Sequence, residues 1–214
     1  MGRRKVPLVA GCTYHVFNKS IAGFEIFRYD EEFLKLRETF CFYATAKLGQ
    51  SYSVAVRQGR VKDPAVHGPS RIRLIAYCLM PTHFHLIVQQ RIEHGIEEYL
   101  QWVQASYARY FNKKVERGGP LFHGRFGARL ITEDGDLLHM TRYVHLNPTS
   151  AGLVADPGDW PWSSYQEYVE CPAKNPLCDY KSLVPLSPLE YQRFAEDRLG
   201  YQRSLQIIKA HLMD

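Results

Sequence analysis

Residues 79–88 read LMPTHFHLIV, and this apolar run with two histidines is the most informative segment of the chain. Apolar and β-branched residues on both sides of Pro81-Thr82 predict two strands, at residues 72–79 and 83–89. The dipeptide itself predicts a tight turn between them. The segment therefore indicates a pair of adjacent strands that carries polar chemistry at the turn end.

The two histidines fall on the same face of the second of these strands. Side chains alternate along a strand, so His83 and His85 point one way while Phe84 points into the core. Two neutral imidazoles on one face can bind a divalent metal ion. Such a pair also occurs as ordinary hydrogen-bonded structure, and the spacing alone leaves both interpretations open.

Hydrophobic periodicity on either side of this segment predicts the order β-α-β-β-α-β. This order is typical of a ferredoxin-like α+β domain with one antiparallel sheet. The strands are expected at 13–18, 72–79, 83–89 and 126–132, and the core helices at 30–47 and 95–114.

Beyond this core the sequence predicts an added helix and a C-terminal helical extension. Acids at its start and Asn147-Pro148 at its end delimit the added helix, residues 135–146. We divide the chain into a catalytic domain, 1–168, and an extension of loop and helix, 169–214. The remaining expected elements are a mobile loop at 48–70 with a short strand at 52–57, a weak helix at 163–169 and an amphipathic helix at 188–213.

The composition limits the class of protein. Of the 214 residues, 45% are hydrophobic and 13% aromatic, which suffices for a packed core and excludes global disorder. No apolar run approaches the ~18 residues of a membrane span, and the apolar residues 6–10 are shorter than a signal-peptide core of ~7–15 residues. The five scattered cysteines form no C-x-x-C pair, as in reduced proteins. We therefore expect a cytoplasmic protein without a membrane segment.

Basic side chains are concentrated in residues 101–130. This window holds six Lys and Arg and one acid, Glu116, so its net charge is six minus one, or +5. Aromatic residues between the charges suit a polyanion whose bases can stack. The same pattern also fits a solvated helix face above core aromatics. The basic residues are Arg109, Lys113, Lys114, Arg117, Arg125 and Arg129.

The added helix carries a second group of candidate residues. Tyr143 and Asn147 are spaced i, i+4 and so lie on one face of a helix. If that helix covers the histidine face, the Asn147 amide oxygen can join His83 and His85 around a metal ion. Two nitrogens and one oxygen with open positions suit Mg²⁺ or Mn²⁺. Tyr143 beside such an ion is a candidate nucleophile toward a phosphodiester.

Spacing alone leaves alternatives to this site. Tyr107 and Tyr110, on the basic helix, are equal rivals as the nucleophile. His139 lies one turn before the added helix's tyrosine and can belong to the site or to the surface. Asn147 before Pro148 can be a simple helix terminator.

Six sequence motifs occur in the order of a known family. They are YHVFNKS (14–20), AYCLMPTHFHLIV (76–88), SYARYFNKK (106–114), GPLFHGRF (119–126), RYVHLNPTSAGLV (142–154) and DWPWSSY (159–165). Together they resemble the REP-associated tyrosine transposases and the related insertion-sequence single-tyrosine transposases of the HUH nuclease superfamily. The resemblance covers residues 10–168 and implies a ferredoxin-like core that binds single-stranded DNA, often at hairpins. The loop at 48–70 and the segment after 170 depart from the family pattern.

The resemblance also implies a role for each matching residue. His83 and His85 correspond to the paired metal-binding histidines of that superfamily. Tyr143 corresponds to the nucleophilic tyrosine and Asn147 to the third, polar metal ligand. Tyr107 and Tyr110 become packing or DNA-stacking residues.

The implied activity is cleavage and joining of single-stranded or hairpin DNA through a 5′-phosphotyrosine intermediate, with Mg²⁺ or Mn²⁺. Two rivals are a domesticated DNA-binding protein without turnover and an unrelated metal enzyme that uses the same histidines. The protein is expected to be a monomer or a homodimer. The residues expected to contact the DNA backbone, with Arg125 of the GRF motif foremost, are Arg109, Lys113, Lys114, Arg125 and Arg129.

Overall fold

The computed structural model describes residues 7–45, 51–59, 70–170, 173 and 176–198. Its strands are β1 (Thr13–Lys19), β2 (Ile72–Met80), β3 (His83–Gln90) and β4 (Gly127–Ile131). Its α-helices are α1 (Asp30–Thr45), α2 (Tyr52–Arg57), α3 (Gly95–Lys114), α4 (Asp134–His145), α5 (Asn147–Ser150), α6 (Tyr165–Val169) and α7 (Pro188–Glu196). Two short 3₁₀ turns are η1 (Ile21–Gly23) and η2 (Pro157–Asp159).

The four strands form one antiparallel sheet in the order β2-β3-β1-β4. The two central strands are β3 and β1, so residues on them are flanked by backbone on both sides. Their register pairs Phe17 with His85 and Lys19 with His83. Opposed residues of an antiparallel pair share a face, so these four side chains lie on one side of the sheet. The predicted ferredoxin-like α+β fold is confirmed.

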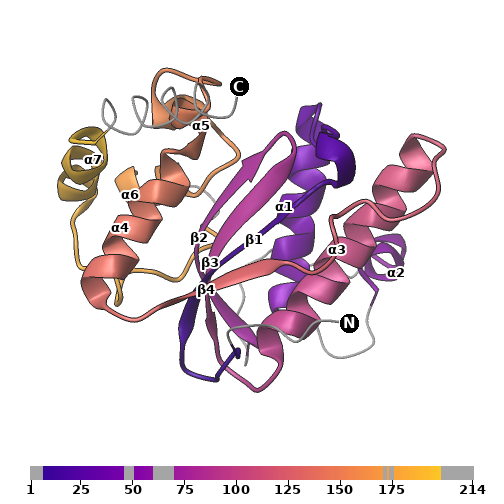
Figure 1. Ribbon diagram of the computed structural model, residues 1–214, viewed down its shortest axis with the longest axis horizontal. Helices are drawn as coiled ribbons and strands as arrows, with labels where there is room; N and C mark the ends of the chain where they lie inside the picture. The colour runs from indigo at the N-terminus through magenta and orange to yellow at the C-terminus, as the bar shows by residue number, and fades with distance from the viewer. Residues whose placement is uncertain (1–6, 46–50, 60–69, 171–172, 174–175, 199–214) are drawn as a thin grey trace.

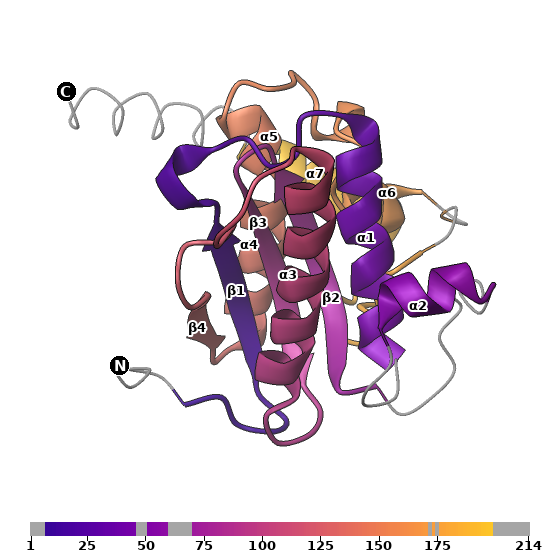
Figure 2. The same cartoon turned by 90° about the vertical axis from the view of Figure 1, so that its right-hand side faces the viewer.

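Each face of the sheet has its own layer of helices (Figure 1). Helices α1 and α3 pack side by side over one face, as Figure 2 shows from the front. The core between them and the sheet is aromatic and aliphatic, because strand residues of even and odd number are sorted onto opposite faces. It contains Tyr14, Val16, Phe84, Leu86, Phe40 and Tyr107.

Helix α4 covers the opposite face, together with α6 and α7 (Figure 1). Leu137 and Val144 of α4 are buried with Ala76, Cys78 and Ile87 of the sheet. Burial of this apolar stripe is what holds the added helix against the strands. The predicted added helix is therefore present, on the face that bears the histidines.

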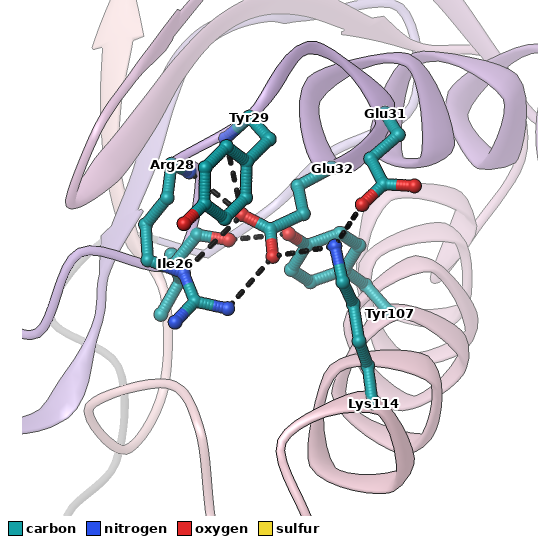
Figure 3. A network of polar contacts seen from close by, with 7 residues as sticks. All are labelled: Ile26, Arg28, Tyr29, Glu31, Glu32, Tyr107 and Lys114. Carbon is teal, nitrogen blue, oxygen red and sulfur yellow. Dashed lines mark hydrogen bonds and ion pairs between the residues drawn. The ribbon is translucent and has the colours of Figure 1, made fainter.

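A polar network joins the start of α1 to the end of α3 (Figure 3). The fully buried Glu32 carboxylate accepts hydrogen bonds from the Arg28 guanidinium at 2.8 Å and from Lys114 Nζ at 3.0 Å. The Lys114 ammonium also pairs with Glu31, and the Tyr107 hydroxyl donates to the Ile26 carbonyl. A buried charge needs such partners, so these residues stabilise the helix pair.

One local prediction is wrong. The segment 52–57 is helix α2 and not a strand, because Tyr52 and Ala55 are both buried at helical spacing. The Tyr43 hydroxyl also accepts a hydrogen bond from the Tyr52 N–H. Helix α4 ends at His145, close to its predicted end before Asn147-Pro148, and Asn147 begins the separate short helix α5, since proline is tolerated in a first helical turn.

Some sequence predictions fall on residues outside the described ranges. The expected mobile loop at 48–70 lies there except for 51–59 and 70, and so does the expected helix beyond residue 198. The division of the chain at residue 168 stays a prediction. Within the described residues, no helix is both long enough and apolar enough to cross a bilayer.

Candidate active site

The two histidines of β3 each leave the same ring nitrogen, Nε2, available on one side of the sheet. Their rings lie edge to face, with centroids 5.0 Å apart. His83 Nδ1 is 2.9 Å from Thr82 Oγ1, and His85 Nδ1 is 2.9 Å from His15 Nε2. With each Nδ1 engaged by a protein partner, the Nε2 atoms are the nitrogens left to bind a ligand. This is how a metal-binding histidine is usually oriented.

The electrostatics of the site keep the imidazoles neutral. Burial, helped by His83 and His15, lowers the pKa of His85 to about 2. Burial and the charge of Arg129 lower the pKa of His15 to about 4. Burial and Lys19 lower the pKa of His83. At pH 7 all three rings are therefore uncharged, which is the form that ligates metals.

Helix α4 brings Tyr143 over these histidines. Its ring lies edge-on to both His85 and His15, with each pair of centroids 5.8 Å apart. The side chain is 40% exposed, in contrast to the buried Val144 beside it. Burial of the hydroxyl raises the pKa of Tyr143, and the Asn147 side chain opposes that shift. Tyr143 is thus a phenol at neutral pH, accessible to a ligand.

The amide of Asn147 is oriented by the helix that precedes it. Asn147 Nδ2 donates to the carbonyl oxygens of Tyr143 at 2.8 Å and Val144 at 3.4 Å. Because both partners are acceptors, the amide nitrogen must face them, and Oδ1 points away. Asn147 therefore offers an oxygen to the same space as the two histidines.

These residues line a pocket of about 550 Å³. Its walls come from β1, β3, the start of β4 with the segment before it, and α4 with α5. The pocket contains two cationic side chains, Lys19 and Arg125, and no carboxylate among its lining residues. An anion is the ligand that this charge distribution favours. The full lining is Phe17, Asn18, Lys19, His83, His85, His123, Arg125, Gly127, Tyr143 and Asn147.

The donor set agrees with the chemistry of a metal site that also binds substrate. Among the described residues, no cluster of three His, Cys, Asp or Glu side chains could hold a metal ion. His15 is therefore a hydrogen-bond partner of His85 and not a third histidine ligand. His83, His85 and the Asn147 oxygen fit Mg²⁺ or Mn²⁺ with positions left for phosphate oxygens.

A buried histidine anchors α4 in this position. His145 is fully buried, with Nδ1 2.7 Å from the Tyr191 hydroxyl of α7 and Nε2 2.7 Å from Ser164 Oγ. Ser164 Oγ in turn accepts from the Tyr77 N–H of β2 at 2.8 Å. Because His145 lies two residues after Tyr143, these bonds determine where the tyrosine sits.

The structure places the predicted basic residues in three different settings. Arg125 lines the pocket, and Arg129 of β4 pairs in register with His15 and is exposed. Arg109 and Lys113 are exposed on α3, on the other side of the sheet. Lys114 is exposed at the end of α3, is not among the residues that line the pocket, and is paired with Glu31 and Glu32.

The rival tyrosines and histidine of the sequence lie away from the pocket. Tyr107 is buried in the α1–α3 core and Tyr110 packs against it. His139 is exposed on α4, with Nδ1 2.9 Å from an Arg142 guanidinium nitrogen. Of the predicted chemical groups, the fold brings together His83, His85, Tyr143 and Asn147.

Sequence reasoning missed the contribution of β1. His15, Phe17 and Lys19 share the face of His83 and His85, and the strict alternation of YHVFNK contained that signal. Without the register between β1 and β3, however, nothing in the sequence places them opposite the histidines.

Comparisons with known proteins find matches to the part of the chain that forms this pocket. Residues 65–147 match a family model described as "Transposase IS200 like", a range that contains both histidines, the tyrosine and the asparagine. A relative from Haemophilus influenzae, named a putative REP-associated tyrosine transposase, is 29% identical over 121 residues. The match covers 51% of this chain and 66% of that protein, which is slightly less than two thirds of its length.

The fold has also been seen in a solved structure. A REP-associated tyrosine transposase bound to a REP hairpin superposes with a TM-score of 0.56 and 16% sequence identity. The match covers 88% of this chain and 96% of that one. The sequence matches confirm the resemblance of this chain to the IS200-like and REP-associated tyrosine transposases, and the solved structure confirms the fold.

Proposed function

We propose that this protein cleaves and rejoins single-stranded DNA through a covalent bond between Tyr143 and a 5′-phosphate. One observation carries the proposal. An accessible tyrosine, Tyr143, lies edge-on to the buried His85 ring, with ring centroids 5.8 Å apart, in a pocket that also holds His83 and Asn147. Tyrosine, imidazole and amide oxygen converge there from segments that lie 58 positions apart in the sequence, at 85 and 143.

The chain's own residues account for the transfer step. Tyr143 Oη attacks the phosphorus of the scissile phosphodiester, and the bond from phosphorus to the 3′-oxygen breaks. The proton lost by the phenol is balanced by the proton that the departing 3′-oxygen takes up. One phosphodiester bond replaces another, so a 3′-hydroxyl can reverse the reaction without an external energy source.

His83, His85 and the Asn147 oxygen would hold Mg²⁺ or Mn²⁺. When bound, such an ion supplies positive charge to the non-bridging oxygens of the scissile phosphate. The three protein ligands are neutral and none of the described residues that line the pocket carries a carboxylate, so the negative charge beside the ion would come from the DNA itself. Hydrogen bonds donated by the two Nδ1 atoms to Thr82 Oγ1 and His15 Nε2 would keep the rings of His83 and His85 oriented toward the ion.

The DNA strand would contact basic residues around the pocket. Arg125 in the lining and Arg129 on the adjacent strand are placed to contact phosphates next to the scissile one. Arg109 and Lys113 would contact a more distant part of a hairpin, on the α3 side of the sheet. The ion pairs of Lys114 with Glu31 and Glu32 make it the weakest of the five expected contacts.

A search for the covalent product tests the proposal. The protein is incubated with hairpin DNA carrying a single-stranded flank, with Mg²⁺ or Mn²⁺, and run on a denaturing gel. A 3′-end label should migrate with the protein and a 5′-end label should not, because the 5′-phosphate is the end that becomes attached. His83→Ala should abolish the adduct while leaving most of the DNA affinity.

The alternative is a domesticated DNA-binding protein of the same fold without turnover. It predicts hairpin binding with no adduct for any ion. An unrelated metal enzyme predicts a metal-dependent activity with no covalent DNA product. The intact set of two histidines, tyrosine and asparagine in one pocket favours the transferase.

We further propose a cytoplasmic protein that acts as a monomer or a homodimer. Cys12, Cys41, Cys78 and Cys178 are free thiols, which suits a reducing compartment. Sedimentation of the protein with and without a hairpin oligonucleotide distinguishes the two assemblies.

A further inference from the structure

Phe17 is an unusually exposed aromatic residue for its place in the sheet. It lies on β1, a central strand, with His85 of β3 on one side and Gly127 of β4 on the other. A phenylalanine on a central strand is normally buried under the covering layer. Phe17 is instead 42% exposed and lines the pocket of Tyr143.

The position of the ring is built into the neighbouring strand. A Cβ atom added at Gly127 would lie 2.4 Å from Phe17 Cζ and 2.6 Å from Cε2. The ring therefore rests directly on the Gly127 backbone, in space that any other residue would occupy. On its other flank the ring centroid is 5.3 Å from that of His15 and 6.1 Å from that of His85. Phe17 therefore packs against the Gly127 backbone and against the rings of His15 and His85, and its remaining surface faces the pocket.

The surroundings of the ring match a nucleotide. Lys19, two residues along β1, and Arg125 place positive charge beside the aromatic surface. The pocket combines this charge with an apolar, planar surface and lacks carboxylates. A phosphate together with an unpaired base has the complementary features, because every base offers a flat apolar face to an aromatic ring.

We infer that Phe17 is a stacking platform for one unpaired base next to the scissile phosphate. The inference rests on the proposed function, since the phosphate position is defined by His83, His85 and Asn147. It adds to the pocket a subsite for one base, formed by the Phe17 ring where it rests on Gly127. Single-stranded DNA is thereby preferred over a duplex, in which bases already stack on one another.

Binding measurements test the subsite without requiring cleavage. Dissociation constants are measured by fluorescence anisotropy for the protein and for Phe17→Leu and Phe17→Trp, with EDTA present. The probes are hairpin oligonucleotides that carry an abasic site at successive positions of the single-stranded flank. Phe17→Leu should weaken binding of intact DNA about tenfold, and Phe17→Trp should retain it.

The decisive result is whether the effect of Phe17→Leu on the dissociation constant depends on the presence of a particular base in the DNA. At one position of the flank, an abasic site should weaken DNA binding to the wild type by the same factor as Phe17→Leu weakens binding of intact DNA. The same abasic site should have almost no further effect on DNA binding by Phe17→Leu. Gly127→Val, which displaces the ring, should reproduce the Phe17→Leu pattern. Leu130→Ala is the matched control, because Leu130 is an exposed apolar residue of β4 on the opposite face, paired with Tyr14.

Two outcomes would overturn the inference. One is that Phe17→Leu binds every probe as the wild type does, and the other is that the losses from Phe17→Leu and the abasic site simply multiply. Thermal melting of each variant shows whether it is folded, and Phe17→Trp separates loss of the ring from loss of structure. A protein that binds DNA but forms no covalent product disproves the proposed function and leaves this test intact.

Discussion

Two side-chain clusters on the α4 side of the sheet contain buried histidine, and one difference between them separates a functional from a structural role. The open cluster consists of His15, His83 and His85 with Tyr143 and Asn147. The sealed cluster consists of His145 with Ser164 and Tyr191. Burial lowers the pKa of His85 to about 2 and that of His145 to about 3, so neither a low pKa nor burial distinguishes the two clusters.

The two clusters differ in whether the second ring nitrogen of each histidine has a hydrogen-bond partner. Both nitrogens of His145 have hydroxyl partners at 2.7 Å, and the surrounding rings of Tyr165 and Tyr168 complete its enclosure. In the open cluster each β3 histidine has one nitrogen engaged and the other directed to a pocket. A histidine whose two nitrogens are both satisfied holds the fold, whereas one with a single satisfied nitrogen is available for chemistry.

The sharpest way to test this comparison is to remove one tyrosine hydroxyl from each cluster. Tyr143→Phe should reduce the covalent DNA adduct by at least about 10³-fold and leave the stability unchanged, because it removes the nucleophile from an accessible side chain. Tyr191→Phe should keep the adduct and lower the free energy of unfolding by about 1–3 kcal/mol, since His145 Nδ1 loses its partner. Adduct yield and urea denaturation check both. Equal effects of the two substitutions on either measurement would contradict the distinction.

Replacing one histidine in each cluster should show the same difference: a large loss of stability for the sealed cluster and a small one for the open cluster. His145→Leu removes the imidazole partner of the Ser164 and Tyr191 hydroxyls in the interior, so we expect a loss of roughly 2–4 kcal/mol in unfolding free energy. His83→Ala should change that free energy far less, because His83 is half-buried at the pocket. Chemical denaturation of both variants measures the difference. A more destabilised His83→Ala would show that the open cluster also supports the fold.

His15 belongs to the open cluster but has a supporting role in it. It is buried, and it contacts His85, a proposed metal ligand. His15→Phe keeps a ring that can stack on His85 but removes the acceptor at 2.9 Å. We expect a loss of about 10- to 100-fold in Mn²⁺ affinity in the presence of DNA, measured by electron paramagnetic resonance. His15→Gln, which restores an acceptor, should recover most of the affinity. Equal affinities for the wild type and His15→Phe would show that the hydrogen bond does not orient His85.

Acid should weaken the fold through the sealed cluster. Burial lowers the pKa of His145 from 6.5 to about 3, so the unfolded chain binds a proton at this site before the native chain does. The stability that the neutral ring contributes is present above pH 6.5 and is lost as the pH falls toward 3. The expected slope is about 1.4 kcal/mol per pH unit for this histidine.

Urea denaturation between pH 7 and pH 4 measures that slope. His145→Gln should make the pH dependence shallower than that of the wild type by this amount. If His145→Gln shows the wild-type slope, other groups must be responsible for the acid sensitivity.

Much of this architecture follows from local sequence. The elements of the core are visible because alternation in strands and the 3.6-residue period in helices are properties of neighbouring residues, as in residues 83–89 and 95–114. The helix α2 was missed because its helical character depends on contacts of Tyr52 with α1, and six residues carry too weak a pattern of their own. The ion pairs of Lys114 with Glu31 and Glu32 cannot be read from the sequence, because these residues lie more than 80 positions away from it.

The sequence by itself determined the order of strands and helices, the shared face of His83 and His85, and the i, i+4 relation of Tyr143 and Asn147. These are consequences of backbone geometry within one element. Only the tertiary structure decided that α4 lies over β3, that His15 and Phe17 join the pocket, and which nitrogen of each imidazole is free. The reason is physical: these relations depend on strand register and on the anchoring of His145, which bring together side chains far apart in the chain.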